Sequence, residues 1–253
     1  MVLAIDIGNT DAVLGLFSPA GLCESLYRFP TRRGVNGASL AKEVLAAPAI
    51  FLEKKISLAV LSSVVPETNS LWREVLGEVF KTTEIFFISH LSPWSFRIGI
   101  DAPEKVGHDR LCNMEAALRY GESVLVVDAG TATKFDLLEN GIFRGGAIAP
   151  GLGISFAALV GGTSQLASIS LEGEGPVVGR NTEEALRSGA VHAFAAQVDG
   201  MIEKIIHERV LAKNTPVIAT GGFSRYLQGR STAITYFSPN HTLEGLNAIS
   251  QKI

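Results

Sequence analysis

The run Val2-Leu3-Ala4-Ile5-Asp6-Ile7-Gly8-Asn9-Thr10 opens the chain and gives the first indication of its fold. An apolar, β-branched run that ends in Gly-Asn is typical of a buried strand that enters a tight turn. Ala12 to Phe17 then resumes the apolar pattern, so we expect a β-hairpin. Considered alone, such a turn is more often a plain hairpin turn than a ligand-binding loop.

The same pattern returns in the second half of the chain. Ser123 to Val127 is another apolar run, and it leads into Asp128-Ala129-Gly130-Thr131-Ala132-Thr133. In both places a glycine follows the aspartate by two residues. Glycine lets backbone N–H groups approach a phosphate, while hydroxyl and amide side chains add donors. Because two such hairpins are much less expected by chance than one, the sequence predicts an internal duplication with two phosphate-binding loops.

Regular elements alternate along the rest of the chain. We expect strands at 22–29, 56–65, 84–88, 133–138, 141–148 and 215–219, and helices at 39–46, 67–80, 107–120, 150–160, 181–208 and from 241 onward. Both halves thus open with a β-meander and continue with strands that alternate with helices. A junction at the helix 107–120 divides the chain into domains 1–117 and 118–253.

Composition limits the possible functions. The 253-residue chain has a formal net charge of −3, and 47% of its residues are hydrophobic. This predicts a folded protein with a sizeable core and excludes the strongly basic surface that nucleic-acid binding requires. Cys23 and Cys112 fit no metal-binding pattern and are expected as reduced, mostly buried thiols. The first apolar run lacks a basic region and meets Asp6 at once, so we expect no signal peptide, no membrane span and a cytoplasmic protein.

Two further motifs place polar groups at the ends of predicted elements. Ala219-Thr220-Gly221-Gly222 follows the last buried strand, where two glycines permit a flat ligand to lie near the backbone; a plain turn is equally compatible. Gly107-His108-Asp109-Arg110-Leu111 opens a helix. Its carboxylate can act as a general base and its guanidinium can hold an anionic substrate. The helix dipole alone also favours an aspartate at this position.

A set of short segments, taken in order along the whole chain, resembles type III pantothenate kinase. The segments are Asp6-Ile7-Gly8-Asn9-Thr10, Ser63-Val64-Val65-Pro66, Gly107-x-Asp109-Arg110, Asp128-x-Gly130-Thr131-Ala132-Thr133, Gly145-Gly146-x-Ile148-x-Pro150-Gly151, Gly179-Arg180-Asn181-Thr182, Thr220-Gly221-Gly222 and Thr242-Leu243-Glu244-Gly245-Leu246. The resemblance implies an α/β fold of two tandem ribonuclease-H-like domains, as in actin-like ATPases, with a nucleotide cleft between them. It also implies ATP-dependent phosphorylation of pantothenate, the first step toward coenzyme A, by a homodimer that uses Mg²⁺ and a monovalent cation, K⁺ or NH₄⁺.

The resemblance also implies roles for individual residues. Asp109 would be the catalytic base, Asp6 would serve Mg²⁺, and Asp128 would help to place the monovalent cation and the phosphates. The residues implied to contact pantothenate are Gly107, Arg110 and, from the partner subunit of a dimer, Thr182. The residues implied to bind ATP are Asp6, Gly8, Asn9, Thr10, Gly130, Thr131, Ala132, Thr133, Gly221 and Gly222. These roles agree with phosphoryl transfer, which needs mostly positioning and charge neutralisation.

Several positions depart from the family pattern. His108 stands where a small residue is usual before Asp-Arg, and the segment 98–106 is shorter than usual and lacks a tyrosine. Asp11 and Lys134 each follow one of the two loops, where neutral residues are usual, and one hypothesis pairs them across the nucleotide cleft. These departures keep two alternatives open: a kinase for another small hydroxylated acid, and a non-catalytic nucleotide-binding regulatory protein.

Overall fold

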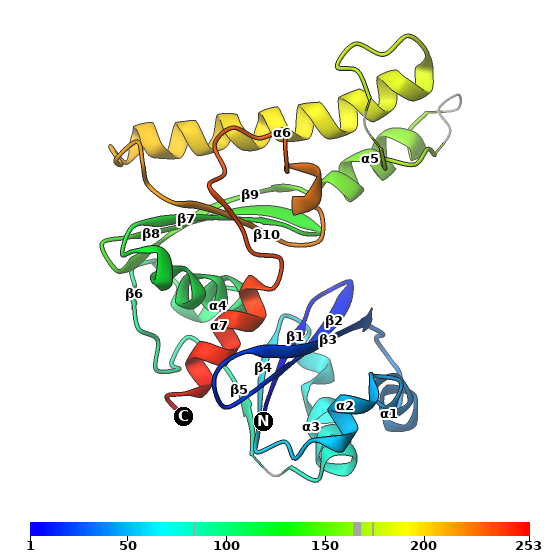
Figure 1. Ribbon diagram of the computed structural model, residues 1–253, viewed down its shortest axis with the longest axis vertical. Coiled ribbons are helices and arrows are strands. Elements are labelled where there is room, and N and C mark those ends of the chain that lie inside the picture. Colours follow the sequence, from blue (N-terminus) through cyan, green and yellow to red (C-terminus); the bar gives the residue numbers. More distant parts are fainter. Residues whose placement is uncertain (83, 164–167, 174) are drawn as a thin grey trace. The chain divides into compact units, whose positions relative to one another are not determined.

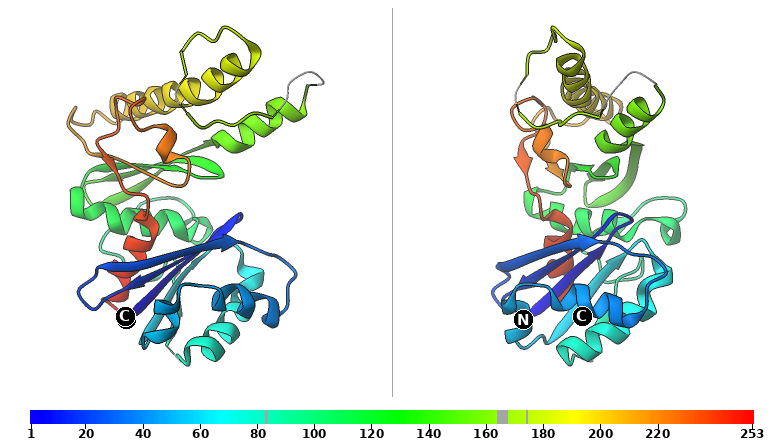
Figure 2. Two further views of the ribbon diagram at one scale, coloured as in Figure 1. Left: turned by 45° about the vertical axis from the view of Figure 1, so that its right-hand side comes forward. Right: turned by 90° about the vertical axis from the view of Figure 1, so that its right-hand side faces the viewer.

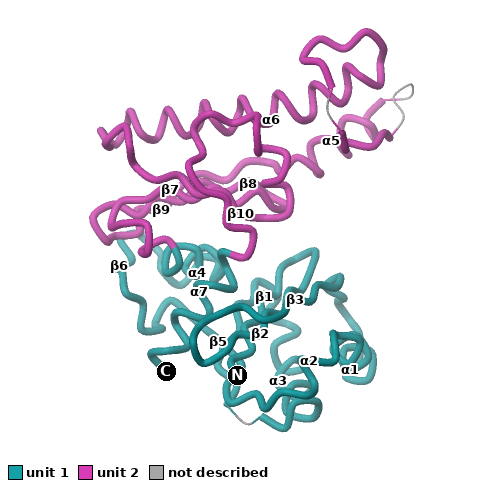
Figure 3. The backbone as a smooth tube through the Cα atoms, viewed as in Figure 1, with its two compact units in different colours: residues 1–116, 241–253 teal, residues 117–240 magenta. Residues whose placement is uncertain are grey.

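The computed structural model describes residues 1–82, 84–163, 168–173 and 175–253. The chain forms two compact units (Figure 3): Met1–Ala116 with His241–Ile253, and Ala117–Asn240. The second unit is therefore one continuous segment, whereas the first unit is built from both ends of the chain. The chain passes from the first unit to the second after Ala116, within one residue of the predicted domain boundary at 117. The structure differs in the last 13 residues, which the sequence analysis assigned to the second domain and which pack in the first unit.

The first unit contains a mixed five-stranded sheet in the order β3-β2-β1-β4-β5. Its strands are β1 (Val2–Ile7), β2 (Asp11–Phe17), β3 (Cys23–Pro30), β4 (Leu58–Ser63) and β5 (Ile85–Phe87). The first three form the predicted antiparallel meander, and β4 and β5 run parallel to β1. Because side chains alternate along a strand, β1 presents one set of residues to each face of this sheet.

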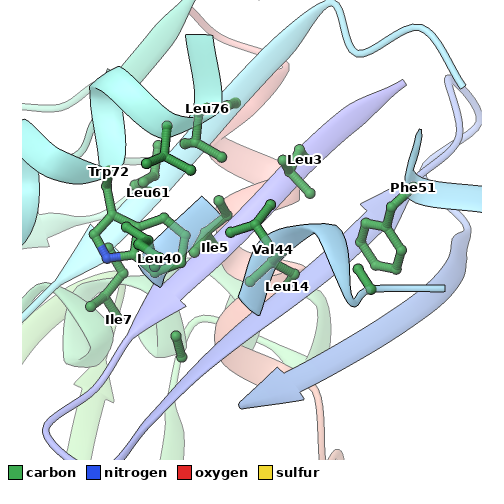
Figure 4. Close-up of a cluster of buried hydrophobic side chains, with 14 of the residues drawn as sticks. Leu3, Ile5, Ile7, Leu14, Leu40, Val44, Phe51, Leu61, Trp72 and Leu76 are labelled. Atoms are coloured by element: carbon green, nitrogen blue, oxygen red, sulfur yellow. The ribbon is translucent and has the colours of Figure 1, made fainter. Parts of the chain in front are cut away.

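Helices α1 (Gly37–Leu45), α2 (Ala49–Glu53) and α3 (Asn69–Phe80) cover one face of the first sheet (Figures 1 and 2). Figure 4 shows the core that results, in which Leu3, Ile5 and Ile7 of β1 meet helix residues such as Val44 and Trp72. The residues of β1 that point this way are fully buried and apolar. Burial of these apolar side chains stabilises β1, the strand that carries Asp6 near its end.

The opposite face of the first sheet packs against α7 (His241–Ser250) and against Cys112 of α4 (His108–Ala117). Leu243, Leu246 and Ile249 of α7 join Ala4 of β1 in a second apolar cluster. The final helix therefore belongs to the first unit because a sheet with two apolar faces must have both covered. Sequence order alone gave no sign of this return.

The second unit repeats the first topology. Its strands are β7 (Val124–Ala129), β8 (Ala132–Glu139), β9 (Ile142–Pro150), β10 (Val217–Thr220) and β11 (Tyr236–Phe237), in the order β11-β10-β7-β8-β9. The first three form an antiparallel meander, and β10 and β11 continue in parallel from β7. Each unit thus has a meander on one side and parallel strands on the other, which confirms the predicted duplication.

Helices α5 (Leu152–Gly161) and α6 (Thr182–Glu208) complete the second unit. The long helix α6 crosses one face of the sheet (Figures 1 and 2) and buries Phe194, Val198 and Ile202 against Val127 and its neighbours. Within the described residues, no helix combines the length and the apolar character that a membrane crossing requires.

Some short elements were not predicted from the sequence. They are α2 of five residues, β6 (Arg97–Ile98) of two residues and β11 of two residues. Elements this short span too little of a helical or strand period to give a pattern. The two cysteines are free, and Cys112 is buried as expected, but Cys23 is exposed.

Candidate active site

The first loop, Gly8-Asn9-Thr10, joins β1 to β2 and is held by hydrogen bonds. The Gly8 N–H donates to the Asp11 carbonyl at 2.9 Å, and a Cβ at residue 8 would lie 3.0 Å from that same oxygen. The Thr10 carbonyl accepts from the Thr31 N–H at 2.8 Å. A side chain at residue 8 would therefore be tight against the Asp11 carbonyl, and the two backbone hydrogen bonds hold the loop.

Arg33 is a candidate residue that sequence reasoning missed. Its guanidinium donates to Asn9 Oδ1 at 2.5 Å and lies 3.8 Å from Glu67. No local pattern in the sequence connects residue 33 to the first loop, because an adjacent basic pair such as Arg32 and Arg33 is typical of a solvated loop. Arg33 brings a positive charge to a loop that was predicted to bind phosphate.

Two predicted carboxylates in the first unit act on one buried thiol. Asp6 ends β1 on the sheet face that carries Ala4, and Asp109 lies in the first turn of α4. Burial raises the pKa of the Cys112 thiol well above its usual range, and the charges of Asp6 and Asp109 raise it further. Both carboxylates therefore lie within electrostatic range of the same buried thiol, although 102 residues separate them along the chain.

The Asp109 carboxylate has a defined orientation. Its Oδ1 accepts a hydrogen bond from the Arg110 N–H at 2.9 Å, and the same N–H lies 3.0 Å from the Gly107 carbonyl. A Cβ at residue 107 would lie 2.5 Å from Asp109 Oδ1. Glycine at 107 thus leaves space for the Asp109 carboxylate in this orientation. Asp109 and Arg110 are both half-buried.

His108 lies beside this carboxylate. Burial lowers the pKa of His108 from its usual 6.5, and repulsion from His90 lowers it a little further, while the Asp109 charge and a hydrogen bond to the Ser63 backbone oppose this change. The imidazole is half-buried and therefore favours the neutral form in the folded state.

Acidification should destabilise the first unit through His108. A depressed pKa means that the unfolded chain binds more protons, so stability falls as the pH drops below about 6.5 and levels off below the folded-state pKa. The variant His108→Asn should therefore lose less unfolding free energy than the unaltered chain between neutral and mildly acidic pH. Urea unfolding followed by circular dichroism across this range measures the difference. An equally steep loss in the variant would contradict the assignment.

The second loop, Gly130-Thr131, is the two-residue turn between β7 and β8. The Gly130 N–H donates to the Ala132 carbonyl at 3.1 Å, and the Gly151 N–H donates to the Thr131 carbonyl at 3.2 Å. A Cβ at residue 151 would lie 2.4 Å from the carbonyl oxygens of both loop residues. Thr131 is exposed, whereas Thr133 is fully buried and its hydroxyl lies inside the unit. Thr131 therefore offers the accessible hydroxyl of this loop.

The glycine turn after β10 lies against Asp128. Parallel pairing places Thr220 opposite Asp128, and Gly221 follows with a φ of 86°, a backbone conformation that favours glycine. A Cβ at residue 221 would lie 2.6 Å from Asp128 Oδ1 and 2.6 Å from the Ala129 carbonyl. The structure thus joins Asp128, the second loop and the Gly221-Gly222 turn in one place within the second unit.

The two unusual charged residues have partners within their own units. Lys134 Nζ lies 2.7 Å from Asp128 Oδ2, and Arg28 Nη1 lies 3.1 Å from Asp11 Oδ2. The sequence-based hypothesis paired Asp11 with Lys134 and predicted neither of these two ion pairs. Arg28 stands near Asp11 because β2 and β3 are paired, and a single sequence does not give that register directly.

Thr182 lies at the first position of α6, next to a well-capped helix start. Asn181 Oδ1 accepts from the Glu184 N–H at 2.9 Å, and Glu184 accepts from the Arg180 N–H at 2.8 Å. Thr182 lines a groove of about 490 Å³ between α5 and α6. The apolar residues of this groove are Leu152, Phe156, Leu159, Ala185, Leu186, Ala190, Ala193 and Phe194.

Comparisons with known proteins agree on one family. The family model for type III pantothenate kinase matches residues 2–204. The chain is 34% identical to the type III pantothenate kinase of Thermomicrobium roseum, over 100% of this chain and 98% of that protein. It is 36% identical to the type III pantothenate kinase of Deinococcus radiodurans, over 97% and 94%.

Solved structures support the fold independently. A ROK family protein from Streptococcus pneumoniae matches with a TM-score of 0.54 at 14% identity, covering 99% of this chain and 98% of that chain. This likeness concerns the fold alone and agrees with an α/β architecture of two similar units. The family model and the two relatives, matched over nearly their whole length, show that the chain belongs to the type III pantothenate kinase family.

Proposed function

We propose that this protein transfers the γ-phosphoryl group of ATP to the primary hydroxyl of pantothenate, giving 4′-phosphopantothenate and ADP in the first step of coenzyme A biosynthesis. The observation that carries the proposal is the Asp109 carboxylate at the start of α4, which the Arg110 N–H orients and which lies within electrostatic range of the same buried thiol as the Asp6 carboxylate. A carboxylate suited to act as a base and a second carboxylate suited to a metal ion in the same unit match the requirements of phosphoryl transfer to an alcohol.

In this mechanism Asp109 accepts the hydroxyl proton of pantothenate. The hydroxyl oxygen forms a bond to the γ-phosphorus, the bond from that phosphorus to the bridging oxygen breaks, and ADP leaves with the electron pair. Arg110 adjoins Asp109 and offers a guanidinium to the pantothenate carboxylate. Gly107 provides space at the same helix start.

We infer that the reaction uses ATP with a divalent metal ion, because phosphoryl transfer from ATP needs its phosphate charge neutralised. Asp6 fits Mg²⁺, because it is a partly accessible carboxylate at a strand end and Mg²⁺ needs few protein ligands. The ion would neutralise charge on the phosphate oxygens. In the first unit, the Asn9 amide and the Thr10 hydroxyl are the proposed donors to the phosphates, and Gly8 keeps the turn tight. In the second unit, the exposed Thr131 hydroxyl is the proposed donor, beside Gly130, Ala132, Gly221 and Gly222.

The resemblance also implies K⁺ or NH₄⁺ beside Asp128. In this chain the Asp128 carboxylate already holds the ammonium group of Lys134 at 2.7 Å. The residues at this position therefore do not fit a separate monovalent cation, and the mechanism proposed here assigns no step to one.

The test is ADP release from ATP and Mg²⁺ with and without pantothenate, in the presence of K⁺. Pantothenate-dependent ADP release supports the proposal. If folded protein binds ATP but releases no ADP with pantothenate, a panel of small hydroxylated acids distinguishes a changed acceptor from a non-catalytic nucleotide-binding protein. We also propose that the protein acts in the cytoplasm, because the proposed reaction consumes ATP.

We also propose that the protein is a homodimer. The groove between α5 and α6 is lined mainly by apolar side chains, and Leu159 on its wall and Ile154 on the same helix are 48% and 49% exposed. An exposed apolar surface of this kind favours a protein partner, and a second copy would cover it and bring Thr182 to a neighbouring subunit.

Light scattering should then give twice the mass of one chain. The variant Ala193→Glu places a charge in the groove and should give single chains, because an unpaired carboxylate in an apolar interface is costly. The control Ala212→Glu changes an exposed residue after α6 and should leave the dimer intact. A single-chain mass for the unaltered protein at micromolar concentration would contradict the dimer.

A further inference from the structure

Lys134 and Asp128 form an ion pair in a protected position. The distance from Lys134 Nζ to Asp128 Oδ2 is 2.7 Å, and the two side chains are only 18% and 12% exposed. Exposed ion pairs are usually weak because water screens them and their side chains are mobile. Because both side chains of this pair are mostly buried, water screens their charges less, and the attraction between them is stronger than in an exposed pair.

The fold fixes this pairing. Lys134 stands directly opposite Asp128 in the antiparallel ladder of β7 and β8, and the turn between these strands contains only Gly130 and Thr131. Residues opposite each other in such a ladder project to the same face with Cβ atoms about 5 Å apart. On its other side Lys134 faces Ile148 of β9. The ammonium group is therefore held on the carboxylate by the sheet register.

The pair lies at the second half of the candidate site. While Asp128 Oδ2 accepts from Lys134, its other oxygen, Oδ1, faces the two glycine turns: a Cβ at Gly221 would lie 2.6 Å from it and a Cβ at Gly130 would lie 3.5 Å from it. One carboxylate thus connects a lysine ammonium group to both turns that are proposed to contact the nucleotide.

The structure assigns to Lys134 the role of a built-in monovalent cation: we propose that its ammonium group replaces K⁺ or NH₄⁺ and that nucleotide binding and turnover do not depend on either ion. An ammonium group and a potassium ion carry the same charge, and two cations on one carboxylate would repel each other at close range. The inference rests on the proposed function for its kinase readout, but its nucleotide-binding readout is independent of the acceptor.

The first experiment measures the affinity for Mg²⁺-ATP by calorimetry in tetramethylammonium chloride and in potassium chloride at equal ionic strength. The unaltered protein should bind equally well in both salts, within about twofold. The variant Lys134→Thr should bind about tenfold more weakly without K⁺, because it loses one charge-assisted interaction. Added K⁺ or NH₄⁺ should restore most of this loss, since the freed carboxylate can then hold a free cation.

The control Lys213→Thr removes an exposed lysine from the loop after α6 and should behave as the unaltered protein in both salts. ADP release with pantothenate is then measured under the same conditions and should follow the same pattern. If Lys134→Thr changes the ATP affinity as expected but the unaltered protein shows no turnover, the result would count against the proposed kinase function and not against the role of Lys134.

Two results would overturn the inference. The first is a tenfold or larger gain in ATP affinity when K⁺ is added to the unaltered protein, and this test needs no variant. The second is a folded Lys134→Thr protein whose ATP affinity is unchanged without K⁺. If Lys134→Thr does not fold, Lys134→Gln provides the same comparison with a side chain of closer length.

Discussion

Asp109→Asn should lower the rate of pantothenate-dependent ADP release by about 10²- to 10⁴-fold, the usual contribution of a positioned general base. The amide keeps the shape of the carboxylate and can still accept from the Arg110 N–H, which lies 2.9 Å from Oδ1. The variant therefore loses the ability to take a proton while the start of α4 keeps its structure. The affinity for Mg²⁺-ATP should stay within about twofold.

Two comparisons make this result specific to the site. Glu74→Gln makes the same change from carboxylate to amide on an exposed position of α3 and should retain full activity. Calorimetry with Mg²⁺-ATP separates loss of chemistry from loss of binding. Near-normal turnover in Asp109→Asn would exclude Asp109 as the base, and loss of ATP binding would assign it to nucleotide contact.

The sequence predicted those parts of the fold that depend on local patterns. Both hairpins are present because each apolar strand carries an aspartate near its end and leads into a short glycine-containing turn, and such a turn can be recognised without knowledge of the rest of the chain. The long helix at 182–208 was expected within one residue, because Asn181 is a strong cap and the following segment is long.

Long-range arrangements could not be predicted in the same way. Residues 241–253 return to the first unit because the second apolar face of its sheet must be covered, and only the assembled sheet reveals that requirement. Lys134 was identified as unusual, but its partner follows from the register of β8 on β7. Register depends on side-chain packing and turn geometry together, so a single sequence leaves it open.

The candidate site likewise contains residues that a local motif predicts and residues that only the structure reveals. Asp109 was predicted from the Gly-His-Asp-Arg motif at a helix start and from the family resemblance, and the structure adds that a Cβ at 107 would lie 2.5 Å from Asp109 Oδ1. Arg33 was missed because nothing in its neighbourhood indicates a contact with Asn9, 24 residues earlier. Residues that reach a site from a separate loop carry no local motif, and they require coordinates to be found.

Gly245→Ala should be the most disruptive small substitution in the closing helix. Helix α7 crosses α4 so closely that a Cβ at residue 245 would lie 2.0 Å from the Cys112 carbonyl oxygen. The neighbouring atom is backbone and cannot rotate away, so the helices must separate. Thr242 and Asn113, whose hydrogen bond spans 2.9 Å across the same crossing, would part with them. We expect a loss of about 3 kcal/mol of unfolding free energy, the upper end of typical overpacking costs.

Gly200→Ala is the matched control. It also replaces a glycine within a helix, but a Cβ there would meet no atom within 4 Å. Alanine is the better helix former, so this variant should be more stable by about 0.5–1 kcal/mol. Urea unfolding of both variants therefore should give shifts of opposite sign. A Gly245→Ala protein as stable as the unaltered chain would mean that α7 does not cross α4 closely, and the assignment of residues 241–253 to the first unit would have to be abandoned.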